Sequence, residues 1–241
     1  MVTASNGSLA FEHAPKFELI APNAIVLTAG SIHEPELLLD TKKEIKGKDL
    51  VREIAESLSK SYRKMRLKRI EDEVLQEVGI LSFDEFHRKQ NLLHENTVLD
   101  LSKRIRDYDL KVVLLLGGVD EKAHLYRICE PGTCRSYDEL GFCCIGSGDR
   151  HAEPVFAFYG FSIEMDEKKA LQIAFLAKKR AEMAGGVGKI TDGWILEKGG
   201  VYEIDAGTIR ELEEIYNKEK GYPRSLGEFE LKRNEIKPPR T

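Results

Sequence analysis

One stretch, residues 111–147, constrains the fold of this chain more than any other. It opens with an unbroken apolar run, Val112–Leu116, which ends at Gly117-Gly118. After a short polar corner, residues 123–128 alternate apolar and polar side chains. A continuous apolar run that stops at glycine is typical of a fully buried strand, and an alternating run is typical of a half-exposed one. The stretch therefore predicts a β-hairpin at the centre of the molecule.

The remaining strands are predicted in pairs. A Pro131-Gly132 turn precedes a predicted strand at Phe142–Ile145, and the corner Gly146-Ser147-Gly148 then opens a helix. Further hairpins are predicted from two more pairs of apolar segments: Lys16–Ile20 with Ala24–Ser31, and Ile190–Leu196 with Val201–Ile204.

Helical patterns fill the rest of the chain. Apolar residues repeat about every 3.6 positions over Lys48–Val78, and Gly79 ends the pattern. Ser82 and Glu85 have the spacing of a capping box for a further helical stretch towards Asp107. Two more helices are expected, Glu167–Met183 after the N-cap Asp166 and then Asp205–Lys218, before a loose polar tail from Gly221.

Strand pairs and helix pairs are grouped in this chain and do not alternate strictly, which argues against a parallel sheet. We predict an α+β fold, a four-layer αββα sandwich of two antiparallel sheets. The helices of 48–109 would lie on one side and those of 153–184 on the other. Residues 1–205 would form the main domain, with a helical insertion at about 48–100, and residues 206–241 a C-terminal helix and tail.

Composition narrows the class of protein. Hydrophobic residues make up 41% and charged residues 32%, as in globular domains. The 37 basic and 41 acidic residues give a net charge of −4, so no nucleic-acid or membrane partner is expected. The first residues lack the basic start and apolar core of a signal peptide, and we expect a cytoplasmic protein.

Four cysteines lie close together in the sequence: Cys129, Cys134, Cys143 and Cys144. They lack the paired C-x-x-C spacing of a zinc site, and the last two would point to opposite faces of a strand. We expect buried thiols, with a Cys129–Cys134 disulfide only in an unusual redox environment. Neither a metal nor an organic cofactor is predicted.

The order of elements and four short matches resemble a proteasome β-type subunit, a member of the N-terminal nucleophile hydrolases. The matches are Lys16, Ala29-Gly30-Ser31, Leu116–Asp120 and Gly146-Ser147-Gly148, and the resemblance covers about residues 3–205. It implies the αββα fold of that family and a threonine-type endopeptidase of protein degradation that acts on unfolded peptides. It also implies a homo-oligomeric ring, or assembly with other proteasome-like subunits.

In that family the hydroxyl of an N-terminal threonine is the nucleophile, and its own α-amine, which titrates near 8, activates it. By position, the resemblance implies that Lys16 lowers neighbouring pKa values, Gly30 donates to the oxyanion and Ser147 lies beside the α-amine. Thr3 and Ser31 match positions in the substrate cleft. Taken singly, the three catalytic candidates have simpler explanations as a strand-edge lysine, a strand-ending glycine and a helix-capping serine.

Two parts of the family pattern lack a counterpart. The family's first two strands, which carry the threonine and an acidic residue, precede the segment that matches Thr3–Lys16. Where the family has an aspartate and, three residues later, a serine, this chain has Met183 and Gly186. We therefore expect the 241-residue chain to be inert towards peptides, and its gene to begin about 15–20 residues earlier.

Three alternatives remain. The chain could be an inactive structural ring subunit, or a member of the same fold class that acts on amides other than protein. It could also be a nucleotide-binding α/β protein with Gly117-Gly118 or Gly146–Gly148 as its phosphate loop. Against this last class, neither G-x-G-x-x-G nor G-K-[ST] occurs, and only Gly146–Gly148 would meet a helix N-terminus. For oligomerisation, helices 48–78 and 167–183 are the candidate surfaces.

Overall fold

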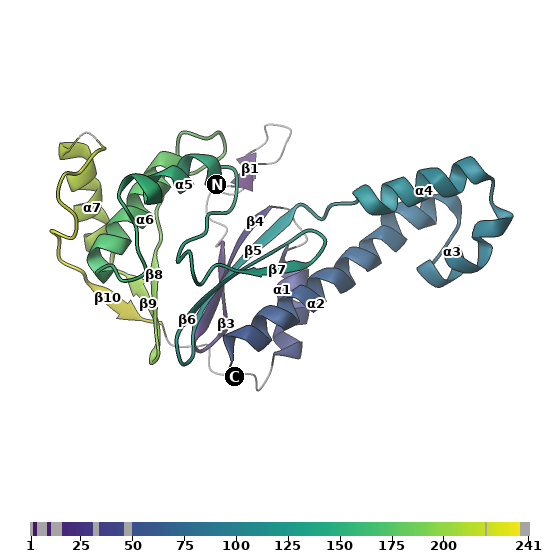
Figure 1. Cartoon of the computed structure of the whole chain (residues 1–241), viewed down its shortest axis with the longest axis horizontal. Coiled ribbons are helices and arrows are strands. Elements are labelled where there is room, and N and C mark those ends of the chain that lie inside the picture. Colours follow the sequence, from purple (N-terminus) through teal and green to yellow (C-terminus); the bar gives the residue numbers. More distant parts are fainter. Residues whose placement is uncertain are drawn as a thin grey trace.

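A five-stranded antiparallel sheet lies at the centre of the molecule (Figure 1). The computed structural model describes residues 2–3, 9–10, 16–30, 34–45, 50–219 and 221–236. The strands of the sheet lie side by side in chain order: β3 (Phe17–Ala21), β4 (Ala24–Gly30), β5 (Val112–Val119), β6 (Ala123–Cys129) and β7 (Thr133–Ser136). The first two predicted hairpins are confirmed, and β4 joins them by pairing antiparallel with β5 over its whole length.

Two helices cover one face of this sheet, α1 (Glu34–Glu44) and α2 (Val51–Ile70). Side chains at alternate strand positions, such as Val26 and Leu116, are fully buried against the apolar stripe of α2. A Cβ on Gly118 would lie 2.7 Å from a methyl group of Val51, so this glycine lets the start of α2 approach the sheet closely. The prediction that β5 ends at its glycine pair was wrong: both glycines pair with β4 and β6, and the strand continues to Val119.

Beyond Met65 the chain leaves the sheet and forms a helical arm, which we define as residues 66–107 (Figure 1). It comprises the end of α2 and then η1 (Glu71–Leu75), η2 (Gln76–Val78), α3 (Phe83–Lys89), η3 (Gln90–Leu92) and α4 (Glu95–Asp107). The arm has its own small core, made of Ile70, Val74, Leu75, Ile80, Phe86 and Leu101. The segment is helical, as predicted, and its outer part forms a projection from the sheet.

The predicted ends of the arm helices are also confirmed. Gly79 ends the first run of helix with a φ of 72°, a left-handed conformation that glycine adopts without strain. The Ser82 side chain accepts a hydrogen bond from the backbone N–H of Glu85 at 3.2 Å. The Glu85 carboxylate in turn accepts from the backbone N–H of Leu81, so the capping box is shifted by one residue from its usual form.

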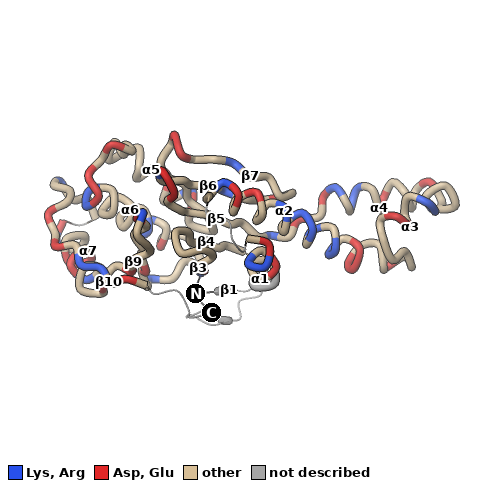
Figure 2. The backbone as a smooth tube through the Cα atoms, turned by 90° about the horizontal axis from the view of Figure 1, so that it is seen from below, with Lys and Arg blue, Asp and Glu red and all other residues tan. Residues whose placement is uncertain are grey.

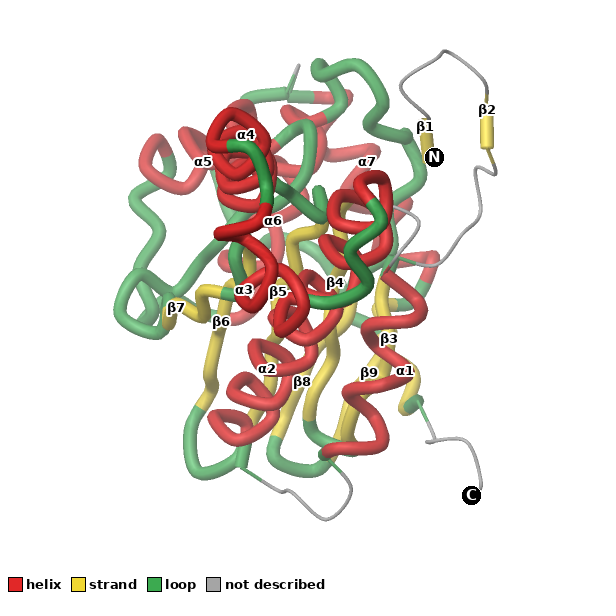
Figure 3. The backbone as a smooth tube through the Cα atoms, turned by 90° about the vertical axis from the view of Figure 1, so that its right-hand side faces the viewer, coloured by secondary structure: helices red, strands yellow, loops and turns green. Residues whose placement is uncertain are grey.

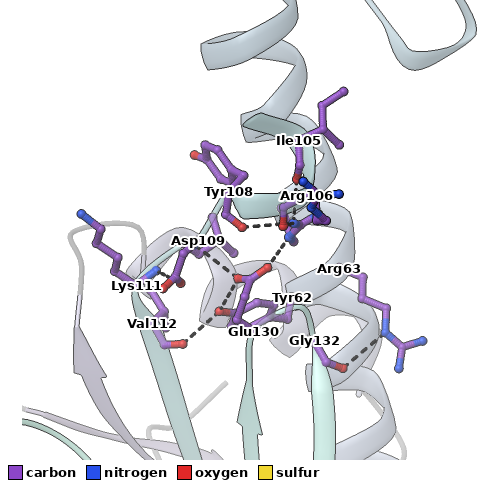
Figure 4. A network of polar contacts seen from close by, with 12 residues as sticks. Tyr62, Arg63, Ile105, Arg106, Tyr108, Asp109, Lys111, Val112, Glu130 and Gly132 are labelled. Atoms are coloured by element: carbon purple, nitrogen blue, oxygen red, sulfur yellow. Dashed lines mark hydrogen bonds and ion pairs between the residues drawn. The ribbon is translucent and has the colours of Figure 1, made fainter. Parts of the chain in front are cut away.

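Glu130, just after β6, binds the base of the arm to the sheet (Figure 4). One of its carboxylate oxygens accepts from the Tyr62 hydroxyl at 3.2 Å and from the backbone N–H of Leu110 at 3.3 Å. The other pairs with the guanidinium of Arg66. The Tyr62 hydroxyl also donates to the Val112 carbonyl at 3.0 Å, and burial raises the pKa of this tyrosine. These contacts connect α2, the chain after the arm, and β5.

Arg66 extends the same network to the C-terminal end of α4, at the base of the arm. Its guanidinium donates to the carbonyls of Ile105 at 2.9 Å and of Tyr108 at 3.0 Å, beyond the last complete turn of that helix (Figure 4). A planar guanidinium can satisfy several acceptors at once, which suits it to a site where helix-end carbonyls would otherwise lack donors. The two long segments of the arm are thereby held together at their base.

A second, three-stranded antiparallel sheet packs on the other face of the first (Figure 3). Its order is β10 (Arg233–Glu235), β9 (Gly200–Ile204) and β8 (Trp194–Glu197). The rings of Phe17 in β3 and Trp194 in β8 stack across the two sheets at 3.9 Å between centroids. The structure thus confirms an α+β fold with two antiparallel sheets and confirms the third predicted hairpin, although β8 begins four residues later than expected.

Three helices lie beyond the three-stranded sheet (Figure 1): α5 (Asp149–Phe158), α6 (Glu167–Ala181) and α7 (Ala206–Lys218). The α6 helix begins after the N-cap Asp166, as predicted. Its side chains Ile173 and Leu176 pack against α5, and Phe175 packs against α7. Its apolar side chains are thus covered by α5 and α7 within the chain, and its expected role as a surface between subunits stays a prediction.

Two further expectations were wrong. Residues 142–145 form no strand, because the Phe142 ring leaves the sheet and stacks on Phe156 of α5 at 4.2 Å between centroids. The strand beside β6 is instead β7, which comes directly after the Pro131-Gly132 turn. The described part of the tail, residues 221–236, is not loose, since Phe229 is buried against α6 and α7 and β10 pairs with β9. In the described part of the chain, no helix is long and apolar enough to cross a membrane.

The network at Glu130 leads to a test of stability. Glu130→Ala removes the common acceptor of Arg66, Tyr62 and Leu110 and leaves their donors partly buried, so we expect a loss of about 3 kcal/mol in the free energy of unfolding. Urea unfolding followed by circular dichroism measures it. The control is Glu44→Ala, which breaks a 3.6 Å ion pair with the exposed Lys60 and should cost about 0.5 kcal/mol or less. Equal losses in the two variants would contradict the role given to Glu130.

Candidate functional site

The predicted catalytic residues gather at one end of the five-stranded sheet, where β3 starts, β4 ends and β5 starts. The carbonyl of Lys16 accepts a hydrogen bond of 2.9 Å from the backbone N–H of Thr28, two residues before Gly30. The Thr28 hydroxyl also donates to the Lys16 carbonyl, at 3.3 Å. The side chain of Lys16 is exposed, so its ammonium group is accessible from solvent. The β3–β4 hairpin therefore sets Lys16 opposite Thr28, two residues before the end of β4 at Gly30.

Gly30 has a conformation that other residues rarely adopt. Its φ is 128°, and a Cβ at this position would lie 1.8 Å from the carbonyl oxygen of Lys111. Lys111 itself has a φ of 56°, and its backbone N–H is held at 2.7 Å by the carboxylate of Asp109. Two constrained backbone positions meet at this corner, Gly30 at the end of β4 and Lys111 just before β5. Only glycine fits at Gly30. The backbone alone imposes this requirement, so it does not depend on the chemistry of the site.

Ser147 comes to the same end of the sheet through the corner that precedes α5. A Cβ built on Gly146 would lie 3.5 Å from the Cβ of Ala29, so this corner touches β4 next to Gly30. Ser147 is exposed and does not cap the helix, because the N-cap of α5 is Gly148. The simpler explanation of this residue as a helix cap is thereby excluded.

Gly148 has a packing role. A Cβ there would lie 2.5 Å from that of Ala181, so the glycine allows α5 to start against the end of α6. Gly117 and Gly118, the other suspected phosphate loop, lie inside β5. Gly118 contacts the start of α2, but the backbone N–H of Val51 there already donates to the Asp120 carboxylate. The glycines of both motifs are accounted for by close packing or strand structure, and nothing in their geometry favours a nucleotide.

Two of the expected substrate-cleft residues cannot be placed against this site. Thr3 belongs to a separate two-stranded ribbon, in which β1 (Val2–Thr3) pairs with β2 (Leu9–Ala10), and its side chain lies outside the described part of the structure. Ser31 also lies outside the described residues. Their predicted contact with substrate stays a prediction.

The cysteines do not provide a second reactive site. Burial raises the pKa of Cys134 to about 11, of Cys143 to about 11 and of Cys144 to about 12, so these thiols stay protonated at neutral pH and are poor nucleophiles. All four thiols are free. Cys134 pairs with Ile128, the neighbour of Cys129, so the side chains of Cys129 and Cys134 point to opposite faces of the sheet and cannot form the disulfide considered above.

The structure reveals one polar cluster that the sequence analysis missed. His124 in β6 has its Nδ1 atom 2.8 Å from a carboxylate oxygen of Asp138 and its Nε2 atom 3.2 Å from one of Asp120. Asp120 also accepts from the backbone N–H of Val51, the first residue of α2, at 2.9 Å, and Asp138 accepts from that of Leu125 at 2.8 Å. The sequence did offer one sign of this cluster: Asp120 and His124 stand on either side of the predicted hairpin turn, close enough to interact.

This cluster resembles part of a catalytic triad, but its geometry is that of a structural connection. Both ring nitrogens of His124 face carboxylates, so neither is directed towards a substrate. The pKa of Asp120 is lowered, chiefly by the hydrogen bond from Val51. Burial alone would raise the pKa of Asp138, but the Leu125 amide and His124 lower it overall. The cluster fixes the β5–β6 turn to the start of α2.

No protein-family model matches the chain, and no curated protein matches it either. Among the residues that the structure describes, no group of three or more His, Cys, Asp or Glu side chains is arranged to hold a metal ion. The candidate site is therefore defined by position alone, because the segments that contain Lys16, Gly30 and Ser147 come to the same end of the sheet.

The corner at Gly30 can be tested by substitution. Gly30→Ala places a Cβ against the Lys111 carbonyl and requires a strained φ, so we expect a loss of about 2–3 kcal/mol in the free energy of unfolding. Gly117→Ala is the matched control within the same sheet, since no atom lies within 4 Å of its Cβ position. Urea unfolding of both variants measures the difference, and a Gly30→Ala protein as stable as Gly117→Ala would refute the close approach.

The cluster around His124 predicts a pH dependence. A carboxyl whose pKa is lower in the folded than in the unfolded state stabilises the fold above its unfolded pKa, about 3.9 for aspartate, and that contribution is lost as pH falls through the folded value. We expect the urea midpoint to drop as the pH is lowered below about 4, and less so in Asp138→Asn. Asp84→Asn, on the exposed face of α3, is the control. A slope in Asp138→Asn as steep as that of the unsubstituted protein would show that this aspartate does not contribute.

Proposed function

We propose that this chain is a subunit of the proteasome type with the N-terminal nucleophile hydrolase fold, and that its site is built for peptide-bond cleavage by an N-terminal threonine. The observation that carries the proposal is that the chain segments containing Lys16, Gly30 and Ser147 lie at the same end of the five-stranded sheet, where Lys16 pairs with Thr28 and Gly146 approaches Ala29. These residues come from three separate elements, β3, β4 and the corner before α5. An αββα arrangement, with two antiparallel sheets between two sets of helices, supports the same assignment.

The free edge of β8 supports the addition of a nucleophile-bearing strand. Among the described strands, none pairs with the outer side of β8. Its first residue, Trp194, stacks on Phe17, the neighbour of Lys16. The Nε1 atom of Trp194 and the hydroxyl of Thr191 are buried without a hydrogen-bond partner. An unpaired edge offers backbone N–H and C=O groups to another strand, and a strand added here would extend the sheet that faces the start of β3.

The proposed reaction needs a threonine with a free α-amine. The α-amine takes the proton from the threonine hydroxyl as the oxygen attacks the peptide carbonyl carbon, and the backbone N–H at Gly30 stabilises the oxyanion. The protonated amine then gives its proton to the leaving amine, and water releases the acyl group from the threonine. The ammonium of Lys16 favours the deprotonated groups by its charge, and Ser147 orients the amine. No threonine with a free α-amine is present among the described residues, so activity depends on a segment outside them.

A second candidate function, an inactive structural subunit of the same assembly, is favoured by the exposure of Lys16, because no described acidic side chain holds it in place. In either case we propose assembly with further copies or with related subunits, as a ring. The two candidates differ in whether the mature protein hydrolyses peptides.

The test is hydrolysis of fluorogenic peptides by the mature form of the protein, isolated from its own cells. We expect Lys16→Ala to lower kcat/KM by about 100-fold or more. The substitution removes the positive charge that lowers the pKa values of the α-amine and the threonine hydroxyl. The thermal midpoint should not change, since the side chain is exposed. The control is Lys122→Ala, an exposed lysine in the β5–β6 turn, at the other end of the sheet.

Three outcomes are informative. A selective loss in Lys16→Ala supports the peptidase. Unchanged activity in both variants contradicts the role of Lys16 and with it the proposed site. No hydrolysis by a mature protein that assembles normally would favour the inactive structural subunit.

A further inference from the structure

The linker between the arm and β5, which we define as residues 108–111, contains the one non-glycine residue with a positive φ in the described part of the chain. That residue is Lys111, whose φ of 56° lies in the left-handed region. A residue with a Cβ adopts this region only when surrounding contacts impose it, and such residues gather at functional sites. The Lys111 carbonyl oxygen lies against Gly30. The strained residue is therefore in contact with the proposed oxyanion donor.

The network at Glu130 fixes the first part of the linker (Figure 4). Arg66 donates to the Tyr108 carbonyl at 3.0 Å, and Glu130 accepts from the Leu110 N–H at 3.3 Å. The side chain of Leu110 is itself buried. The linker therefore cannot shift along the sheet unless these contacts break.

Arg66 takes its ion-pair partner from outside its own helix. Residues 57–70 of α2 contain six Lys or Arg and no Asp or Glu, so this part of α2 is basic and has no carboxylate one turn away from Arg66 (Figure 2). The partner is Glu130, which follows β6 in the sheet. Arg66 therefore connects the arm to the sheet through the same carboxylate that holds the linker.

The last part of the linker is fixed by its own carboxylate and by β5. Asp109 accepts from the N–H of Lys111, two residues further along the chain, at 2.7 Å. Such a bond closes a tight turn and favours the left-handed conformation of Lys111. The next residue, Val112, pairs with Gly30 in the β4–β5 register, and its carbonyl accepts from the Tyr62 hydroxyl. Lys111 is thus held from both sides.

We propose that Asp109 and Lys111 are positioning residues of the candidate site, which fix the backbone N–H of Gly30 and make its position depend on the base of the arm. The oxyanion role of Gly30 rests on the proposed function. Oxyanion donors act at about 2.7–3.1 Å from the developing charge, so a small displacement of Gly30 weakens its contribution. The Lys111 carbonyl lies where a Cβ of Gly30 would be and limits this backbone from one side. Neither positioning residue needs to touch the substrate, because both act through Gly30.

The NMR signal of the Gly30 amide reports its surroundings without any need for activity. Isotope labelling of alanine carbonyl carbons and glycine nitrogens selects Ala-Gly pairs, and the sequence has three of them, at Gly30, Gly185 and Gly207. Gly207→Ala and Gly185→Ala each remove one signal and so assign all three. The signals of Gly185, after α6, and Gly207, in α7, serve as internal references.

Two substitutions of Asp109 test the positioning role in the full 241-residue chain. Asp109→Ala should move the Gly30 signal, because Lys111 loses the acceptor that favours its conformation. Asp109→Asn keeps a carbonyl oxygen that accepts the same bond, so the signal should stay close to its position in the unsubstituted protein. Both variants lose the carboxylate charge, so the pair separates the hydrogen bond from the charge. Asp109 is exposed, and both variants are expected to fold.

Dependence on the arm base is tested with Arg66→Met, which removes the donor to Tyr108 and the pair with Glu130 and should also move the Gly30 signal. If this variant does not fold, Arg66→Lys keeps the charge but loses the planar set of donors and replaces it. The matched control is Arg104→Met. Arg104 pairs with a glutamate of the arm at 2.6 Å, and its loss should leave the Gly30 signal in place.

The proposal is overturned if the Gly30 signal stays in place in Asp109→Ala or in the Arg66 variant. It is also overturned if Arg104→Met moves the signal as far as they do, or if the signals of Gly185 and Gly207 move by as much as that of Gly30.

Peptide hydrolysis by the mature protein separates this inference from the proposed function. If both hold, Asp109→Ala lowers kcat about tenfold with little change in KM, and Asp109→Asn does not. A Gly30 signal that moves in Asp109→Ala while kcat stays the same would overturn the role of Asp109 at the site. A mature protein that hydrolyses no peptide in any form fails the proposed function instead, and the Gly30 signal still decides whether the linker positions that backbone.

Discussion

The pairing of β4 with β5 is the constraint on which the rest of the structure depends. It joins residues 24–30 to residues 112–118, so the whole of α1, α2 and the arm is a loop that closes between two neighbouring strands. Both strands are buried along most of their length, which offsets the entropy of closing so long a segment. At one end of this pair, Gly30 meets Lys111, and Val112 accepts the hydrogen bond from Tyr62. The candidate site and the network that holds the arm therefore share one corner.

That shared corner gives the arm a physical connection to the site. Glu130 and Tyr62 hold the base of the arm against the start of β5, and Lys111, the residue before β5, limits the position of Gly30. A displacement of the arm base would move the strand end that faces Gly30.

Much of the fold could be predicted from the sequence, because the residues that start or end helices and strands locally agree with the pattern of buried apolar side chains. The apolar run before Gly117, the cap Asp166 and the stop at Gly79 each determine structure within a few residues of themselves. The predicted strand at Phe142–Ile145 does not form, because the Phe142 ring stacks on Phe156 of α5. This is a tertiary contact, which the periodicity of the sequence does not indicate. The polar tail became ordered for a similar reason, through the burial of Phe229.

The candidate site was predicted only in part. Order along the chain was enough to bring Lys16 and Gly30 together, since a hairpin places them in neighbouring strands. The position of Ser147 needed the contact of Gly146 with Ala29, which depends on how α5 packs against α6. The cluster at His124 was missed because its second aspartate, Asp138, lies beyond β7 in sequence and reaches the histidine only through the fold.

The central claim, that this corner serves an N-terminal threonine, is tested most directly by chemical labelling. The mature protein, isolated from its own cells, is treated with a peptide that ends in an electrophilic vinyl sulfone, and the modified residue is identified by tandem mass spectrometry. The account predicts a single adduct, on a threonine at the N-terminus. An adduct on an internal serine or cysteine, or none at any residue, would contradict it.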